Sequence, residues 1–427
     1  MKKIIFTMFM LVIVANAQQP LTLTDAITIA LENNYDIKIT RADQQIASIS
    51  NAWGAAGAFP TVSFSANSSL VWDYNDNADY TQERKTAGVS LNWLLFDGFA
   101  MWIRKDKLNL YEELSAGHTA IVVENTIQSV ILAYYKVLLE HEKLLVSESL
   151  KNLSRDRYNY ESERQQLGSL TTYDLLQAKN SWLEDQGRFL MQRVIYKNAV
   201  RDLNYLLAEA PDRTYEFVED FCVEPKTFNV DSLSRKMLRS NSTLKNQYLS
   251  QALLEKEVKL TRSEWWPTLS FTGGYSDVNS KLTLSGMNAD NQGSYNYNAA
   301  LNLSWSLFNG GNRKRAVEIA KIDRETGEIE IENMKHALMN QLYNYYEIHL
   351  VRQELLGVAK EALETAELNL NISEEKFRSG AINSFNYRDV QLLYLNAAVN
   401  NLDAVYAYID VETALMRLTG GIISQYE

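Results

Sequence analysis

The sequence contains an internal duplication, and this feature constrains the fold more than any single motif. Phe96-Asp97-Gly98 returns as Phe308-Asn309-Gly310. The residues after Gly168 return after Gly380, and the two copies are separated by the same number of positions as Phe96 and Phe308. The separation is still the same where Leu206 returns as Leu418. A constant shift over so long a stretch indicates that both copies build the same rigid element. The period is too long for a solenoid repeat, so we expect one structure made of two similar halves.

The N-terminal segment 1–17 has the pattern of a secretory signal peptide. Lys2 and Lys3 precede an apolar run from Ile4 to Val14, and Ala15-Asn16-Ala17 supplies the small residues of a cleavage site. We therefore expect the mature chain to begin at Gln18. No later stretch approaches the roughly 20 apolar residues of a membrane helix, so any membrane span must consist of strands.

Charge and residue usage exclude several classes of protein. The net charge is −11, and removal of the two signal-peptide lysines makes it −13, which disfavours binding to nucleic acid phosphates. Cys222 is the only cysteine, so no disulfide forms within the chain. The histidines do not recur with the duplication, and none forms a close metal-ligand pair with another histidine or with Cys222. They are His118, His141, His336 and His349. We expect neither an enzyme nor a bound cofactor or metal.

Each half reads as a helix, two strands, a very long helix and a returning helix. In the first half, the helix from Thr24 to Gly57 precedes the strands, and the long helix runs from Gly98 to about Gln166. At about 70 residues, such a helix is roughly 105 Å long. Within the long helix of the second half, Leu356, Ala359, Leu363 and Ala366 follow a heptad pattern, which predicts coiled-coil packing. We divide the chain into a signal peptide (1–17), a first repeat (18–209), a linker (210–230), a second repeat (231–420) and a C-terminal tail (421–427).

The predicted strands alternate between apolar and polar residues. Val62, Phe64 and Trp72 share one face of the first strand, and Tyr295, Tyr297, Leu301 and Leu303 share one face of the last. One explanation is a sheet packed on a soluble core. The strands are, however, long enough to cross a bilayer, and the chain carries an export signal, so we favour a membrane-spanning sheet. Four strands are too few to close a barrel, so other chains must supply the rest.

The order of these elements, the Phe-Asp/Asn-Gly units after the hairpins and the glycine-containing turns at Gly168 and Gly380 closely resemble the TolC-type outer-membrane efflux family. The resemblance covers Gln18 to Gly420. It implies a mainly helical fold with a membrane β element, in which three chains each give four strands to a 12-stranded barrel that continues as a long α-helical barrel. It also implies a homotrimer in the outer membrane of a Gram-negative bacterium, extending into the periplasm. The implied function is a passive channel in tripartite efflux or type I secretion, with a periplasmic adaptor and an inner-membrane pump or transporter as partners.

The same resemblance assigns roles to residues near the two turns. Those expected to contact the adaptor are Gly168, Ser169, Thr172, Asp174, Gly380, Ala381 and Ser384. Asp389 and Asn386 occupy the positions of acidic residues that narrow the pore. Asp174 matches a residue that latches the closed state, with Arg378 or Arg388 as possible cationic partners. Independently of the family, glycine permits the tight reversal, and Thr172 and Ser384 are expected to cap the returning helices.

Two other functions remain open from the sequence. A self-contained porin requires a closed barrel from a single chain, and the small number of strands counts against it. A soluble periplasmic coiled-coil scaffold or adaptor predicts extraction from cells without detergent.

Overall fold

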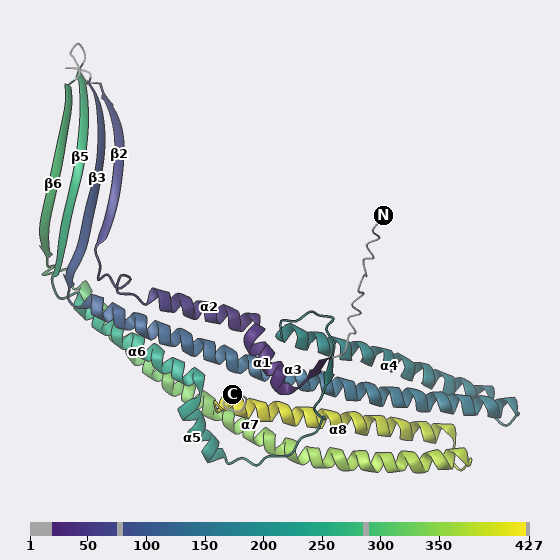
Figure 1. Cartoon of the computed structure of the whole chain (residues 1–427). Coiled ribbons are helices and arrows are strands. Elements are labelled where there is room, and N and C mark those ends of the chain that lie inside the picture. Colours follow the sequence, from purple (N-terminus) through teal and green to yellow (C-terminus); the bar gives the residue numbers. More distant parts are fainter. Residues whose placement is uncertain (1–18, 75–79, 285–289, 424–427) are drawn as a thin grey trace, which may run out of the picture. The chain divides into compact units, whose positions relative to one another are not determined.

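The computed structural model describes residues 19–74, 80–284 and 290–423, so the expected signal peptide and the last four residues of the tail lie outside it. The chain divides into two compact units (Figure 1). A sheet unit comprises Ile39–Ile121 and Ser242–Ala337, and a helix unit comprises the residues up to Lys38, Val122–Asn241 and those from Leu338 onward. Each unit combines segments of both repeats. The two halves of the duplication are therefore not separate domains.

Four antiparallel strands form the sheet, as the sequence predicts. They are β2 (Thr61–Asp73), β3 (Tyr80–Asp97), β5 (Thr268–Leu284) and β6 (Asp290–Ser304), in the order β2-β3-β5-β6. The central pair, β3 and β5, joins the first repeat to the second. β2 and β6 are the edges of the sheet in this chain, and each presents backbone groups that a further strand can pair with.

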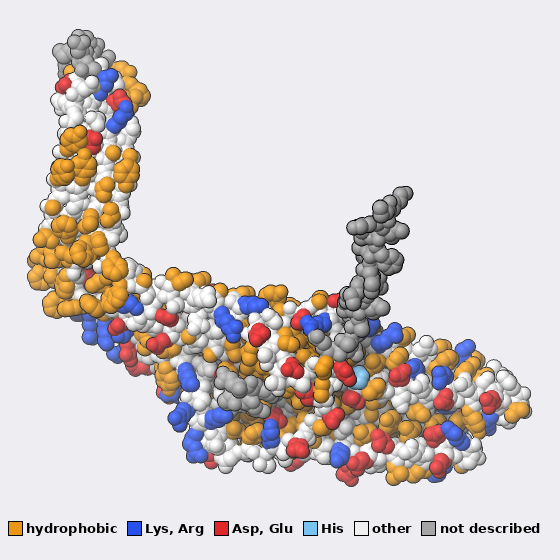
Figure 2. Space-filling model, in the orientation of Figure 1, with side chains coloured by type: hydrophobic (Ala, Val, Ile, Leu, Met, Phe, Trp, Pro, Cys, Tyr) orange, Lys and Arg blue, Asp and Glu red, His pale blue; other side chains and the backbone are white. Residues whose placement is uncertain are grey.

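The strand register separates the two faces of the sheet by polarity. One cross-strand row contains Val89, Tyr275 and Tyr297, whereas the next row contains Ser90, Gly274 and Asn298. Successive side chains alternate between faces, so the first row belongs to an apolar face and the second to a face of small polar groups. The apolar face is not buried in the chain, since Tyr297 is 78% exposed. Figure 2 shows the apolar side chains spread along the strands and concentrated at their helix-proximal end.

Aromatic residues gather where the strands meet the helices of the sheet unit. They include Trp53, Phe59, Trp93, Phe99, Trp102, Trp265, Trp266 and Trp305, all of which are exposed. The indole N–H groups of Trp93 and Trp305 donate to the carbonyls of Ala58 and Trp265, at 3.0 and 3.1 Å. The two tryptophans are related by the shift that relates Phe96 to Phe308, so the duplication also repeats this contact. Ring systems with one apolar side and one hydrogen-bonded end are typical of membrane interfaces.

The helix unit contains two helical hairpins. The first joins α3 (Ala100–Gln166) to α4 (Thr172–Leu206), and the second joins α7 (Asn312–Arg378) to α8 (Ser384–Leu418). Both long helices begin in the sheet unit and are 67 residues long, close to the expected length. The core of this unit surrounds Tyr134, which is fully buried and donates its hydroxyl to the carbonyl of Leu21 at 2.8 Å. Leu21 ends β1 (Gln19–Leu21), which pairs in parallel with β4 (Tyr215–Phe217).

The segment between the repeats is held against the helices by specific contacts. The backbone N–H of Lys226 donates to the Tyr408 hydroxyl at 2.8 Å, and the Lys226 ammonium lies 2.7 Å from Glu412. His349 is fully buried between Phe228 and Tyr408, with ring centroids 4.9 and 5.2 Å away. Burial lowers the pKa of His349, and Glu412 opposes that shift.

The structure corrects the prediction of one continuous helix before each pair of strands. Asn34 separates α1 (Leu23–Asn33) from α2 (Tyr35–Ser50), and Asn241 separates α5 (Val230–Ser240) from α6 (Ser242–Ser263). Both asparagines have an extended backbone, with ψ of 133° and 121°. Their side-chain amides donate to the carbonyls of Leu206 and Leu418, each at 2.9 Å. The bond from Asn34 satisfies a carbonyl at the end of α4, and the bond from Asn241 satisfies one at the end of α8. In both places the helix is broken at the asparagine that makes the bond.

The start of the first helix also differs by two residues from the prediction. Thr22, not Thr24, caps α1, and Asp25 completes a capping box with it. Among the described residues, no helix is both long and apolar enough to cross a membrane.

Candidate functional site at the hairpin turns

The two turns have nearly the same backbone geometry. Gly168 and Gly380 adopt φ values of 75° and 76°, in the left-handed region that favours glycine. The residue after each glycine donates its N–H to a carbonyl five positions back: Ser169 to Arg164 at 2.9 Å, and Ala381 to Lys376 at 2.8 Å. This is the Schellman pattern of helix termination. Both turns therefore project from the ends of α3 and α7 in a fixed conformation.

The returning helices are capped one residue earlier than predicted. Thr171 and Asn383 are the N-caps of α4 and α8, and their side chains accept from the N–H groups of Asp174 and Asn386. Thr172 and Ser384 are instead the first residues of these helices. The three-residue spacing between the cap and the donating N–H decides the position, because the capping oxygen must reach the third helical N–H.

The structure gives Asp174 and Arg378 local partners. The Asp174 carboxylate accepts from the Thr171 hydroxyl at 2.6 Å, so it belongs to the cap of its own helix. Arg378 lies 2.5 Å from Glu374, one turn earlier on α7, and is 72% exposed. Neither contact links one hairpin to the other. These two residues are not paired with each other in this conformation.

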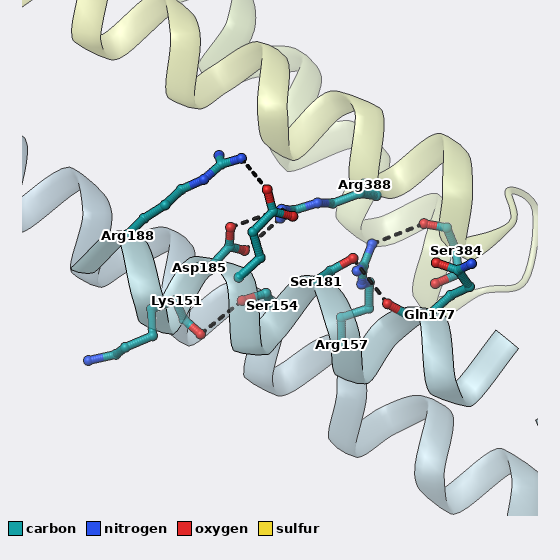
Figure 3. A network of polar contacts seen from close by, with 10 residues as sticks. Lys151, Ser154, Arg157, Gln177, Ser181, Asp185, Arg188, Ser384 and Arg388 are labelled. Atoms are coloured by element: carbon teal, nitrogen blue, oxygen red, sulfur yellow. Dashed lines mark hydrogen bonds and ion pairs between the residues drawn. The ribbon is translucent and has the colours of Figure 1, made fainter. Parts of the chain in front are cut away.

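Arg388 makes a buried ion pair that joins the hairpins. Its guanidinium donates two hydrogen bonds to Asp185 on α4, at 2.6 and 2.9 Å (Figure 3). Asp185 is 1% exposed and Arg388 is 9% exposed. A bidentate, charge-assisted pair of this kind fixes both distance and orientation between two helices. We refer to Arg388 and Asp185 as the interhairpin pair.

A buried polar cluster extends from this pair toward the turn. The guanidinium of Arg157, on α3, donates to the carbonyl of Ser384 at 3.2 Å. Burial and the nearby charge of Arg388 lower the pKa of Arg157 to about 10. Glu161, one turn further along α3, is 1% exposed, and neither carboxyl oxygen has a well-aligned hydrogen bond among the described residues. Burial raises the pKa of Glu161, while Arg164 and the Ser384 side chain oppose this shift.

Two clefts open beside the cluster. A cleft of about 140 Å³ lies between α4 and α8, and both Asp174 and Arg388 line it. A larger cleft of about 380 Å³ lies between α3 and the second hairpin, with Tyr160, Phe377 and Tyr387 among its walls. Because Asp174 and Arg388 line the same cleft, Asp174 lies close to the interhairpin pair. The carboxylate that Arg388 binds is nevertheless that of Asp185.

The predicted pore residues lie on the surface of α8. Asn386 and Asp389 are three residues apart, on one side of the helix, and both are exposed. The structure thus separates the predicted residues into two groups. The turn residues and Asp389 are accessible to a partner or to solvent, whereas Arg388 is part of the buried cluster. Sequence reasoning did not find Asp185, Arg157 or Glu161, which look like ordinary charges on long amphipathic helices.

The model of the family described as outer membrane efflux protein matches residues 26–209 and 233–421, once in each half of the duplication. No curated protein matches the sequence.

Several solved structures share the fold. The chain is similar to CusC with a TM-score of 0.76 and 16% identity, over 93% of this chain and 92% of that one. It is similar to the Campylobacter jejuni outer membrane channel CmeC with a TM-score of 0.73 and 16% identity, over 93% and 85% of the two chains. It is similar to the Neisseria gonorrhoeae outer membrane channel MtrE, solved in an open state, with a TM-score of 0.70 and 14% identity, over 94% and 89%. Since the family model covers most of both halves, this chain belongs to the outer membrane efflux protein family.

Proposed function

We propose that three copies of this chain form a passive outer-membrane channel that extends into the periplasm and serves a tripartite efflux or type I secretion system. Its partners are a periplasmic adaptor and an inner-membrane pump or transporter. The channel has no energy source of its own, so transport is driven by the pump. The pump, and not the channel, selects the exported substrate.

The observation that carries the proposal is the sheet with one apolar face, one polar face and two open edges. An apolar face suits contact with lipid, and a face of serine, asparagine and glycine suits a water-filled lumen. In lipid, unpaired backbone groups at β2 and β6 are costly, so the edges need strands from other copies. Membership of the efflux family agrees with this use of the sheet.

At the other end of the long helices, the turns and α8 form the gated end of the channel. Three copies of Asp389, one from each chain, form a negative ring that attracts cations. The interhairpin pair holds α8 against α4 in the closed state. Adaptor binding to the turns at Gly168 and Gly380 shifts the population toward a state in which this contact is broken.

Fractionation and conductance measurements test the proposal. The protein should require detergent for extraction, migrate as a trimer and form channels in planar bilayers. Asp389→Ala should weaken block by divalent cations, whereas Asp410→Ala, an exposed aspartate elsewhere on α8, should leave the block unchanged. Equal cation block in the parent protein and Asp389→Ala would remove Asp389 from the pore.

The same experiments separate the two other functions. A soluble scaffold or adaptor would be released from cells without detergent. A self-contained porin would conduct as a monomer, and its conductance would not depend on an adaptor. Recovery of a detergent-dependent trimer that remains mostly closed without a partner excludes both.

A further inference from the structure

Glu161 on α3 is a buried carboxyl group without a partner for its charge. Its side chain is 1% exposed, and neither carboxyl oxygen has a well-aligned hydrogen bond among the described residues. The Ser384 hydroxyl, at the start of α8, is close enough to favour the ionised form, but it does not balance the effect of burial. A buried carboxylate that is unpaired is costly, whereas the neutral acid is much less so. The protonation state of Glu161 therefore affects how well its surroundings pack.

The charged groups that act on Glu161 come from α3, α4 and α8. Arg157 and Arg164, on α3 itself, favour the ionised carboxylate, and Asp174 on α4 disfavours it. Arg388 on α8 acts on Arg157, whose pKa it lowers together with burial. Burial of Glu161 outweighs the two arginines of α3, so the pKa of Glu161 is raised above 4.5.

Arg157 lies one turn before Glu161 on α3 but makes no hydrogen bond to it. Its guanidinium instead donates to the carbonyl of Ser384 at 3.2 Å, which ties α3 to the first residue of α8. The Nε atom of Arg157 has no hydrogen-bond partner among the described residues, and the same is true of both Glu161 oxygens. The acid and the base are thus one turn apart, and the base is used to hold the other hairpin.

The second half of the duplication shows that this position of a long helix does not require a charge. By the constant shift of the duplication, Arg157 and Glu161 correspond to Asn369 and Ser373 on α7. Ser373 is also buried, and its hydroxyl donates to the side-chain oxygen of Asn369 at 3.3 Å. A neutral, hydrogen-bonded pair is sufficient to build the same helix. The buried acid of α3 therefore has a role other than helix formation.

We propose that Glu161 is an acid-sensitive lock, which strengthens the contact between the two hairpins when its carboxyl group is protonated and weakens that contact when it is ionised. The contact contains the bond from Arg157 to Ser384 and lies beside the interhairpin pair. When the hairpins separate, the carboxyl group enters water and its pKa returns to the ordinary value. Protonation therefore stabilises the packed arrangement.

The sign of the pH dependence follows from the raised pKa of Glu161. The stabilisation is fully present below pH 4.5 and is lost as the pH rises through the pKa of the packed arrangement. Acid conditions hold the hairpins together, and neutral conditions leave them easier to separate. The identification of the packed arrangement with a closed channel rests on the proposed function.

Hydrogen exchange followed by mass spectrometry tests the lock in the intact, detergent-purified protein. Protection of residues 384–391, corrected for the intrinsic exchange rate at each pH, should be higher at about pH 5 than at about pH 7.5. The largest possible change is about tenfold for each unit by which the pKa of Glu161 exceeds 4.5. In Glu161→Gln, protection should be high at both pH values, because the amide is a neutral group of the same shape. The matched control is Glu163→Gln, which removes an exposed glutamate and should retain the pH dependence of the parent.

A second variant changes the position of the transition without touching Glu161. Asp174→Asn removes the α4 charge that disfavours ionisation of Glu161, so the change in protection should move to lower pH. The asparagine oxygen can still accept from the Thr171 hydroxyl, which keeps the helix cap. A purely structural role for Glu161 predicts no such movement.

The outcomes distinguish this inference from the proposed function. Protection in the parent that is equal at both pH values would overturn the lock, even in a protein that forms channels. The lock would also be wrong if Glu161→Gln kept the pH dependence of the parent, or if its protection were low at both pH values. A pH-dependent contact that Glu161→Gln abolishes, in a protein that forms no channels, would support the lock and contradict the proposed function.

Discussion

Removal of Arg388 should destabilise the closed arrangement of the two hairpins far more than removal of an exposed arginine. Arg388→Ala leaves the Asp185 carboxylate, which is 1% exposed, without its bidentate partner. An uncompensated buried charge typically costs about 3–5 kcal/mol. At 1.4 kcal/mol for each factor of ten, the lower value increases the population of the separated state roughly 100-fold.

Hydrogen exchange followed by mass spectrometry measures this change locally. In the parent protein, the amides of residues 384–391 should be protected by the packing of α8 against α3 and α4. In Arg388→Ala, their exchange should accelerate by about 100-fold or more, while peptides from the sheet remain unchanged. The same variant should open more often in planar bilayers, because the separated state is the conducting one in the proposed mechanism.

Two further variants separate the loss of the interhairpin pair from the loss of any arginine. Arg378→Ala removes an arginine whose ion pair with Glu374 is exposed, so exchange should hardly change. Arg388→Met combined with Asp185→Leu replaces the buried pair by apolar groups and should restore most of the protection. If Arg388→Ala and Arg378→Ala behave alike, or if the double variant is as exposed as Arg388→Ala, the pair does not hold the hairpins together.

Three other predictions follow from particular contacts. Gly168→Ala and Gly380→Ala should each destabilise their hairpin by about 1–2 kcal/mol, measured by hydrogen exchange of the turn, because φ near 75° strains a residue with a Cβ atom. Asn34→Ala and Asn241→Ala should each lower the free energy of unfolding by about 1 kcal/mol in denaturant titrations, because each loses a 2.9 Å bond to a helix-terminal carbonyl. Burial lowers the pKa of His349 from 6.5, so its neutral form contributes stability that is present above pH 6.5 and is lost as the pH falls toward the folded-state pKa. Thermal unfolding between about pH 7.5 and 5.5 should show this loss, and His349→Gln should reduce it.

The sheet was predictable because its signal is local and repeated. Alternation along a strand assigns each residue to a face, and the observed register places the predicted apolar residues of β2 and β6 on the same side. The long helices were equally accessible, since their periodicity continues for 67 residues up to a glycine turn. The alternation alone predicted the four long strands, and the structure confirms that they form one sheet.

The helix breaks and the buried cluster depended on contacts that no local pattern encodes. Asn34 and Asn241 are not related by the shift between Phe96 and Phe308, so the duplication does not pair them. Each accompanies a helix break through a bond to a carbonyl of a helix that lies far away in the sequence. The interhairpin pair spans 203 residues, and in sequence Asp185 is one exposed-looking carboxylate among many. Only the packing of α4 on α8 distinguishes it.

Residues shared by the two halves of this chain build the same backbone twice. Residues that differ between the halves give the two hairpins different charges and contacts. Asp389 corresponds to Gln177 in the first half, so only the second half carries a carboxylate at this position. Asn386 corresponds to Asp174, whose carboxylate is bonded to the Thr171 hydroxyl of its own helix cap. In the proposed channel, the charge of the Asp389 ring therefore comes from the second hairpin. The buried ion pair between Arg388 and Asp185 is likewise absent at the corresponding positions. Divergence between the halves has thus placed the proposed pore residue, Asp389, and one partner of the interhairpin pair on the same helix, α8.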